Sequence, residues 1–191
     1  VFLDQNGVAV ITPLIINNGS YDACSSITLS VNPTTLTCAN LGNAIVTLIV
    51  TDGCNNISSC NATVKVTDAM PPKMSCQGFD AEIDADGNPI VLSWQDFDNG
   101  SSDNCGIVDW DLSKTQLDCS NLGKNTIKIK ARDASGNESE CQAYVTVRDL
   151  LPPVFSFVLD DATVYCDENS ATDEPEAFDN CGLVGISMVD A

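Results

Sequence analysis

The stretch Val64-Lys65-Val66-Thr67-Asp68-Ala69-Met70-Pro71-Pro72 decides how this chain is organised. It returns as Val145-Thr146-Val147-Arg148-Asp149-Leu150-Leu151-Pro152-Pro153. Each copy alternates apolar with other residues, as a half-buried strand does, and then runs through an aspartate into a proline pair that ends ladder hydrogen bonding. The two aspartates are 149 − 68 = 81 residues apart, so the phrase indicates a repeat.

Cysteines keep the same spacing. Cys24, Cys38 and Cys60 recur 81 residues later as Cys105, Cys119 and Cys141. Near the end of the chain, Asp179-Asn180-Cys181-Gly182 copies Asp103-Asn104-Cys105-Gly106. We therefore predict module 1 over residues 1–70, module 2 over residues 71–151 and a partial module 3 over residues 152–191.

The strands of the two modules agree on which positions face inward. In each module three runs alternate with period two, which is typical of half-buried strands. The expected inward residues are Ile27, Leu29, Val31, Val46, Leu48, Val50, Ala62, Val64 and Val66 in module 1, and Val108, Trp110, Leu112, Ile127, Ile129, Ala131, Ala143, Val145 and Val147 in module 2. The fold class expected from this pattern is all-β, with each module a β-sandwich whose core in module 2 is plugged by Trp110.

Charge and cysteine content limit the environment and the partners. The chain carries 27 acidic and 8 basic residues, a formal net charge of −19. This disfavours nucleic acid and anionic membranes and favours divalent cations. No apolar run approaches the ~20 residues that span a bilayer, so no membrane insertion is expected. Ten cysteines without any histidine indicate disulfides in an oxidising compartment rather than a zinc site.

Nothing in the sequence forms a catalytic constellation. Without histidine there is no Ser-His or Cys-His pair, and no glycine-rich loop that would cradle a phosphate is present. Scattered carboxylates in turns do not make an acid–base pair. We therefore expect a protein that is not an enzyme.

Three elements of the sequence resemble hyalin-type (HYR) repeats. They are Pro-Pro-x-x-x-Cys at Pro71–Cys76, Asp-Asn-Cys-Gly at Asp103–Gly106, and Asp-x-x-Gly-Asn at Asp133–Asn137 leading to Cys141–Asp149. The resemblance is to the four-cysteine variant that occurs in tandem in large bacterial surface proteins, including gliding and adhesion proteins of the Bacteroidetes group. It covers essentially the whole chain and implies tandem immunoglobulin-like modules. Module 1 departs from the pattern because it lacks the early cysteine and has an extra Cys54.

The resemblance also implies a disulfide scheme. The early cysteine would pair with the one that opens the last strand, as Cys76–Cys141. The inner cysteines would pair locally, as Cys24–Cys38 and Cys105–Cys119, and Cys54 could bridge Cys60. Cys166 and Cys181 would pair outside this stretch. Counting alone leaves the connectivity open, since four cysteines allow three arrangements.

Acidic clusters in the loops are candidate calcium ligands, because calcium takes six to eight oxygen ligands. One group is Asp84 and Asp86, with Asp4 and Asn6 as equivalents. The second group is Asp96, Asp98 and Asp103 with Asp133, which the linker residue Asp68 could join. The alternative is ordinary turn chemistry, in which Asp-Gly and Asn-Gly need no ion.

Together these features predict a secreted or cell-surface structural and adhesive stalk segment, braced by disulfides and calcium. Its partners would be neighbouring repeats of the same chain, other surface proteins or glycans. One alternative is an accessory module of a secreted enzyme that binds a carbohydrate or another ligand. Another is a filament with lateral contacts through Ile45 and Ile49, whose side chains face outward by periodicity.

Overall fold

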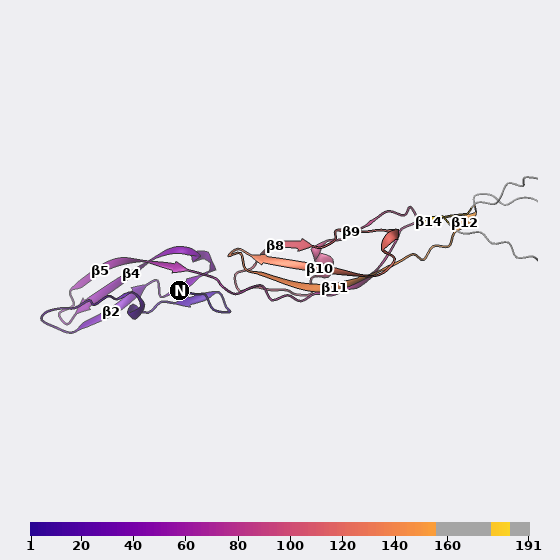
Figure 1. Cartoon of the computed structure of the whole chain (residues 1–191). Coiled ribbons are helices and arrows are strands. Elements are labelled where there is room, and N and C mark those ends of the chain that lie inside the picture. Colours follow the sequence, from indigo (N-terminus) through magenta and orange to yellow (C-terminus); the bar gives the residue numbers. More distant parts are fainter. Residues whose placement is uncertain (156–176, 184–191) are drawn as a thin grey trace, which may run out of the picture. The chain divides into compact units, whose positions relative to one another are not determined.

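The structure is a computed structural model, and it describes residues 1–155 and 177–183. The described chain is built from strands, with two single-turn α-helices and two single-turn 3-10 helices (Figure 1). The fold-class prediction is confirmed: the protein is all-β, of the immunoglobulin-like β-sandwich type. Cys166 and most of the expected module 3 lie outside the described residues.

The elements of the first repeat are β1 (Val8–Val10), α1 (Pro13–Ile16), β2 (Ile27–Asn32), β3 (Thr35–Thr37), η1 (Cys38–Asn40), β4 (Gly42–Asp52) and β5 (Ile57–Val66). They form a three-stranded sheet in the order β2-β4-β5 and a two-stranded sheet of β1 and β3, all antiparallel. Thr67 also pairs in parallel with Phe2, which closes the edge beside the chain's first residues.

The elements of the second repeat are β6 (Phe79–Glu82), β7 (Ile90–Val91), α2 (Trp94–Phe97), β8 (Ile107–Leu112), β9 (Gln116–Leu117), η2 (Cys119–Asn121), β10 (Gly123–Asp133) and β11 (Glu138–Arg148). The larger sheet has the order β6-β11-β10-β8, with β6 parallel to β11, and the smaller one pairs β7 with β9. The third repeat contributes β12 (Val154–Phe155), β13 (Ala177–Asp179) and β14 (Gly182–Leu183).

Chain contacts divide the molecule into two compact units. The first consists of Val1–Ser75, Gly100–Asp111 and Lys130–Glu140, and the second of Cys76–Asn99, Leu112–Ile129 and Cys141–Ala191. Each unit therefore combines most of one repeat with loops from the repeat that follows. The predicted module boundaries after residues 70 and 151 remain a prediction.

The cores consist of the inward faces that periodicity predicts on the two long strands of each repeat. In repeat 1 the residues of β4 and β5 pack with Leu3, Ile11 and Leu36 from the opposite side. In repeat 2, Ile127, Ile129, Ala131, Ala143, Val145 and Val147 are all buried. Apolar side chains at these positions are removed from water on both strands, which is the main stabilising term of such a domain.

Three expectations about side chains differ from the structure. Val108 is exposed and Trp110 is only half-buried, so Trp110 does not plug the core. Phe97 is fully buried there instead and packs against Phe79 with ring centroids 5.4 Å apart. The helix α2 carries Phe97 inward, and its first turn is closed by a capping box of Ser93 and Asp96. Of the two expected outward isoleucines, Ile45 is exposed but Ile49 is half-buried.

Replacing Ile129 with alanine should lower the free energy of unfolding by about 2–5 kcal/mol, because a fully buried aliphatic side chain is lost and a cavity remains. The matched control is Ile45→Ala, which should change stability by no more than about 0.5 kcal/mol because Ile45 is an exposed strand residue. Urea denaturation of both variants measures the difference. Equal destabilisation by both variants would contradict the assignment of the two faces.

Candidate functional site

Three aspartates converge where the linker after β5 meets two loops of the second repeat. Asp68 lies in the linker, Asp103 precedes β8, and Asp133 ends β10. One carboxylate oxygen of each lies within 4.8 Å of the others. All three residues belong to the first compact unit. The structure therefore brings together three of the seven predicted metal ligands.

The cluster is removed from water. Asp68 is 2% exposed and Asp133 is 1% exposed, whereas Asp103 is half-buried. Three like charges at this spacing are costly, since two unit charges 4.8 Å apart repel by roughly 3.5 kcal/mol at an effective dielectric constant of about 20. Burial raises the pKa of Asp103, the charges of Asp68 and Asp133 raise it further, and a hydrogen bond from the Cys105 N–H acts in the opposite direction.

Several oxygens of the cluster have no hydrogen-bond donor. Asp68 Oδ2, Asp103 Oδ2 and Asn104 Oδ1 are buried and unpartnered. The other oxygens are held by turns: Asp68 Oδ1 accepts from the Met70 N–H at 3.1 Å, and Asp103 Oδ1 accepts from the Cys105 N–H at 2.8 Å. A buried acceptor without a donor costs free energy, and a cation would satisfy several of them at once.

Two asparagines fix the linker against the loops. Asn104 Nδ2 donates to Asp68 Oδ1 at 3.1 Å and to the Asp4 carbonyl at 3.1 Å. Asn137 Nδ2 donates to the Asp68 carbonyl at 3.2 Å and to Asp133 Oδ2 at 2.8 Å. Both asparagines stand in the sequence motifs Asp103–Gly106 and Asp133–Asn137, but the motifs alone did not indicate a structural role for them.

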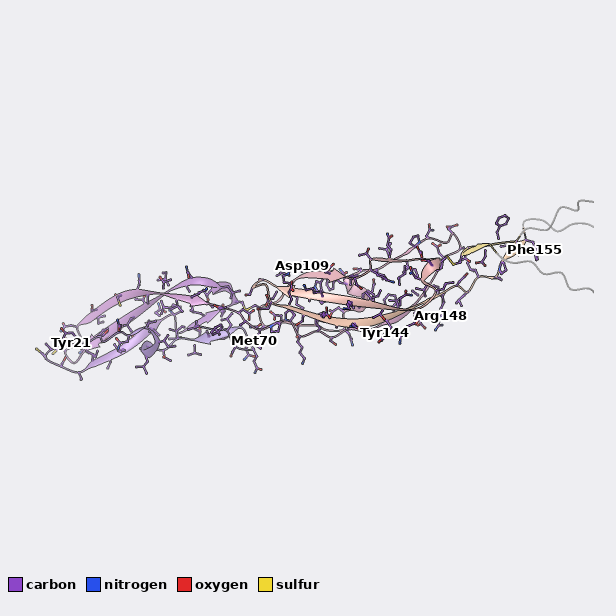
Figure 2. The ribbon with its side chains drawn as sticks, viewed as in Figure 1. Tyr21, Met70, Asp109, Tyr144, Arg148 and Phe155 are labelled. Atoms are coloured by element: carbon purple, nitrogen blue, oxygen red, sulfur yellow. A yellow bond between two sulfur atoms is a disulfide. The ribbon has the colours of Figure 1, made fainter. Side chains whose placement is uncertain are left out.

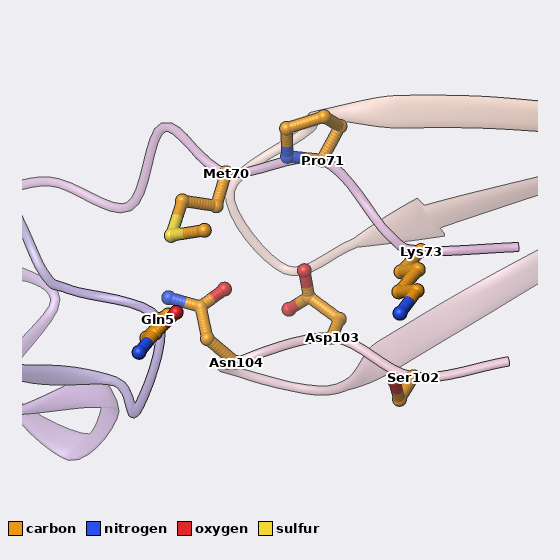
Figure 3. A pocket seen from close by; sticks show the side chains of 7 residues that line it. All are labelled: Gln5, Met70, Pro71, Lys73, Ser102, Asp103 and Asn104. Atoms are coloured by element: carbon orange, nitrogen blue, oxygen red, sulfur yellow. The ribbon is translucent and has the colours of Figure 1, made fainter.

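An open pocket borders the cluster. Its walls are Gln5, Met70, Pro71, Lys73, Ser102, Asp103 and Asn104 (Figure 3). Figure 3 shows the Asp103 and Asn104 side chains pointing from their loop into the space beneath Met70 and Pro71 of the linker. The linker and the loop are held together farther on by the paired backbones of Lys73 and Ser102, with N···O distances of 2.8 and 3.0 Å. The prolines and this short ladder fix the entry of the chain into the second repeat.

The other predicted ligands lie apart from the cluster. Asp84 closes an Asx turn: its Oδ1 accepts from the Asn88 N–H at 2.8 Å and its Oδ2 accepts from Asn88 Nδ2 at 2.9 Å. These bonds lower the pKa of Asp84, with the Asn88 side chain as the largest cause. Asp86 is exposed in the same turn, and Asp4 holds the equivalent turn in repeat 1. These are the bonds of an ordinary Asx turn, and calcium at this group stays a prediction.

Asp96 lies in the helix α2 and Asp98 is its C-cap residue, and neither is part of the cluster. Asp96 Oδ2 accepts from the Ser93 N–H at 2.7 Å and so caps the helix. Asp98 follows the helix and pairs with Cys76 in an isolated bridge. The expectation that both join Asp103 assumed a continuous polar loop, which the helix interrupts.

The disulfides differ from the local scheme. Cys76 is bonded to Cys141, as the resemblance implies, with Cα atoms 6.3 Å apart. Cys38, however, is bonded to Cys105, and Cys119 to Cys181, with Cα separations of 5.4 and 5.2 Å. The expected pairs Cys24–Cys38 and Cys105–Cys119 are therefore not formed. Each of these two bonds joins a cysteine of one repeat to the Asp-x-Cys loop of the next repeat.

Geometry explains why Cys24 and Cys38 do not meet. Cys24 lies near the end of β4, since Ile27 pairs with Asp52, whereas Cys38 precedes the start of β4 at Gly42. An eleven-residue strand separates these ends, which is about 36 Å, and a disulfide needs Cα atoms within about 7 Å. Cys24, Cys54 and Cys60 are exposed and form no disulfide among the described residues. Cys60 pairs with Leu48 inside the sheet, about 10 Å along β5 from the end at Ile57, which keeps it from the Cys54 turn.

A second copy of the junction follows one repeat later, in the second compact unit. Asp149 and Asp179 lie within 4.8 Å of each other and of the bonded Cys181. Asn180 Nδ2 donates to the Asp84 carbonyl at 3.0 Å, as Asn104 does to Asp4, and Asn180 Oδ1 is again buried and unpartnered. The junction is therefore a repeated feature of the chain.

Asp103→Asn should raise the melting temperature of the cation-free protein at pH 7 by several degrees. The substitution removes one buried charge and turns the unpartnered Oδ2 into a donor toward Asp68 and Asp133, and each kilocalorie per mole shifts the midpoint by about 4–8 °C. Asp84→Asn is the control and should lower the midpoint, because it loses the Asn88 bond. Scanning calorimetry in chelator measures both variants. A lower midpoint for Asp103→Asn would contradict the repulsive cluster.

The advantage of Asp103→Asn should shrink as the pH falls. The pKa of Asp103 is raised in the folded state, so the folded wild-type protein binds this proton more tightly than the unfolded chain does. Its charge destabilises the fold above the raised pKa, and the penalty disappears below the unfolded value of about 3.9. The difference in melting temperature between variant and wild type, measured from pH 7 down to pH 4 in chelator, reports this effect. The other carboxylates are common to both proteins and so cancel in this comparison. A difference in melting temperature that stays the same from pH 7 to pH 4 would contradict the raised pKa of Asp103.

Comparisons with known proteins give one family match and several similar solved structures. Residues 67–147 match the family described as HYR domain. Among solved structures, the chain is similar to mouse clustered protocadherin PcdhgC3 EC1-3, with 20% identity over 73% of this chain and 55% of that chain, at a TM-score of 0.35. It is also similar to human mucin-like protocadherin EC1-2, with 11% identity over 78% and 94% of the two chains and a TM-score of 0.41.

A third similarity is to the fibronectin(III)-like modules of CbhA from Clostridium thermocellum, with 10% identity over 68% and 83% of the chains and a TM-score of 0.30. No helix among the described residues is long and apolar enough to cross a membrane. The HYR match and the three disulfides are consistent with an extracellular module. The match to the HYR domain family covers residues 67–147, which are 81 of the 191 residues of the chain.

Proposed function

We propose that the chain is a segment of an extracellular structural and adhesive stalk whose junctions are stiffened by calcium and by disulfides between successive repeats. The observation that carries the proposal is the buried cluster of Asp68, Asp103 and Asp133, with carboxylate oxygens that have no donor. Large bacterial surface proteins of the gliding or adhesion type are the setting that the repeat resemblance suggests.

The donor set fits calcium. All candidate ligands are oxygens, which a hard cation prefers, and two ligands about 2.4 Å from one ion lie at most about 4.8 Å apart, the limit met by the three carboxylates. The unpartnered Asn104 Oδ1 is a further oxygen beside the cluster. Calcium tolerates irregular and bidentate carboxylate geometry, whereas magnesium demands a near-ideal octahedron.

A cation held there would act on the linker. Asp68 belongs to the segment between the repeats, and Asp103 and Asp133 belong to loops of the second repeat. A cation bound by all three carboxylates would therefore hold the linker against these loops. The Cys38–Cys105 bond crosses the same boundary and closes a span of 67 residues, which the chain-entropy model values at about 4 kcal/mol. Neighbouring repeats of the same chain are therefore the first partners of each module.

The accessory binding module of a secreted enzyme is the second candidate, and the structure offers less for it. The exposed aromatic residues of the described chain are spread over different elements and form no row on one strand: Phe2, Tyr21, Tyr144 on β11, Phe155 on β12 and Phe178 on β13 (Figure 2 labels Tyr21, Tyr144 and Phe155). Tyr144 carries the Lys124 ammonium 3.6 Å from its ring centroid. The proposal also includes other surface proteins or glycans as partners that the stalk binds.

Calcium at about 100 times its dissociation constant should raise the free energy of unfolding by roughly 2.7 kcal/mol. Asp68→Asn should abolish the response, because it removes a buried ligand charge. The matched control is Asp86→Asn, the same chemical change at an exposed turn position, which should leave the response intact. Thermal melts in chelator and in millimolar calcium decide the matter. An unchanged wild-type midpoint would remove calcium from the proposal.

The stiffening itself requires a separate measurement. Small-angle X-ray scattering of the wild-type chain should show a narrower distribution of interatomic distances in calcium than in chelator, because the linker loses freedom. The Asp68→Asn variant should scatter alike in both conditions. Calcium binding without any change in scattering would leave a bound ion but contradict its mechanical role.

A further inference from the structure

We infer that the end of the first repeat around Cys24 is a half-built junction, which accepts the Cys-x-Asn-Leu-Gly turn and the linker aspartate of another module of this kind through a disulfide at Cys24. The inference goes beyond the proposed calcium-stiffened stalk, because it assigns an interaction surface and a covalent site. It depends on the equivalence of three loops and not on calcium.

The first argument is the pattern of bonding among equivalent cysteines. Cys105 and Cys181 each follow an aspartate by two residues, and each is bonded to the cysteine that opens a 3-10 turn of the preceding repeat. Cys24 is the equivalent of Cys105, since 105 − 24 = 81. It is exposed and forms no disulfide within the described ranges, although both of its equivalents do.

The second argument is that the Cys24 loop makes the same aspartate-to-cysteine hydrogen bond as the bonded loops. Asp22 Oδ1 accepts from the Cys24 N–H at 2.9 Å, as Asp103 Oδ1 does from Cys105 at 2.8 Å and Asp179 Oδ1 does from Cys181 at 3.0 Å. The same side-chain bond therefore holds the cysteine in all three repeats, although Gly106 and Gly182 have positive φ angles (90° and 132°) and Ser25 at the equivalent position does not.

The third argument is the neighbouring turn at Asp52, which repeats the Asp133 turn of the complete junction. Asp52 Oδ1 accepts from the Cys54 and Asn56 N–H groups and its Oδ2 from Asn56 Nδ2, each at 2.8 Å. Asp133 makes the same three bonds with Ser135 and Asn137. Gly53 N–H donates to Ser25 Oγ at 3.1 Å, which ties this turn to the Cys24 loop.

Two of the three junction carboxylates are therefore in place beside Cys24. Asp22 and Asp52 correspond to Asp103 and Asp133, and the charge of Asp52 acts on Asp22 to oppose the lowering of its pKa by the Cys24 N–H. The missing members are an aspartate from a linker, as Asp68 is, and a cysteine from a 3-10 turn, as Cys38 is. Both would come with one module, which identifies the chemistry of the partner.

Two differences set limits on the fit. Ala23 replaces Asn104, so the amide that donates to Asp4 and Asp68 in the complete junction is absent. Ser25 replaces Gly106 and spends its hydroxyl on Asp22 and Gly53. The acceptor end thus relies more on the disulfide than the junction at Cys105 does.

Bond formation needs an oxidant, for which glutathione disulfide serves. The Cys24 thiolate attacks one glutathione sulfur and releases one glutathione, and the incoming thiolate then attacks the mixed disulfide at Cys24 and releases the second. Two protein thiols are oxidised, one glutathione disulfide is reduced to two thiols, and the two protons remain on the products.

The test is a fusion in which residues 71–151 and then residues 71–80 precede Val1 of the full chain, in register with the repeat. The fused protein is refolded in glutathione buffer with chelator, so that the outcome does not depend on calcium, and its disulfides are mapped by mass spectrometry without reduction. We expect a bond between Cys24 and the copied Cys119, with complete loss of Cys24 alkylation. The Cys76 of the added residues 71–80 should bond to Cys60, because Cys60 is the equivalent of Cys141. This bond verifies that the fusion is in register with the repeat.

Several outcomes would overturn the inference. In a fusion that retains Cys38–Cys105 and Cys76–Cys141, an alkylatable Cys24 or a Cys24–Cys54 bond contradicts it. The copied Cys119→Ser variant should restore alkylation of Cys24, and failure to do so is equally contrary.

If the fusion does not fold, the unfused Cys181→Ser variant, whose Cys119 is released, is mixed with wild-type chain. A disulfide-linked dimer that Cys24→Ser abolishes supports the inference, and no Cys24-dependent dimer refutes it. Calcium melts of the unfused chain report on the proposed function separately, so the two ideas can fail independently.

Discussion

Three carboxylates that share one poorly solvated space repel one another, and the arrangement of the junction follows from this constraint. Asp68 and Asp133 are almost fully buried, and Asp103 stands against both. Each is held by the backbone N–H groups of its own turn, so none can swing away into solvent without losing those bonds. The fold thus builds a strongly negative, preorganised space and places it where one repeat passes into the next.

The sandwich supplies the rigidity that this arrangement needs. The inward residues of β10 and β11 are buried, and the hairpin between these strands carries Asp133 and Asn137 at its tip. Ion pairs link the two strands of the same hairpin: Lys130 and Arg132 of β10 both contact Glu138 of β11. The basic strand residues therefore pair across the hairpin and help to hold its turn, which contacts the linker, in place.

Periodicity was enough to predict the two long strands of each repeat, because the two copies of these strands agree on their buried positions. The same periodicity could not decide the disulfides. A bond from Cys38 to Cys24 and a bond from Cys38 to Cys105 are related by one translation of 81 residues, so the spacing alone does not distinguish them. Only the length of β4, which separates the two ends of the module, excludes the local pair.

Short elements were missed for a similar reason. The helix α2 is a single turn, too short for a helical period, yet it buries Phe97 and takes Asp96 and Asp98 away from the cluster. Asp68, Asp103 and Asp133 could be selected from ligand type and loop position, but Asp84 has the same type and position and its carboxylate accepts from Asn88 within its own turn.

The Cys38–Cys105 and Cys119–Cys181 bonds also determine how far the chain can be stretched. A pulling force that enters at Cys38 passes through the sulfur atoms to Cys105, follows the backbone to Cys119 and crosses by sulfur again to Cys181. Only the 119 − 105 = 14 residues between the bonds can extend under load, which is about 50 Å of slack in each repeat, whereas an unbridged repeat of 81 residues would release about 280 Å. Unfolding of a sandwich would therefore lengthen the protein only slightly, because the covalent path through the disulfides bypasses most residues of each repeat.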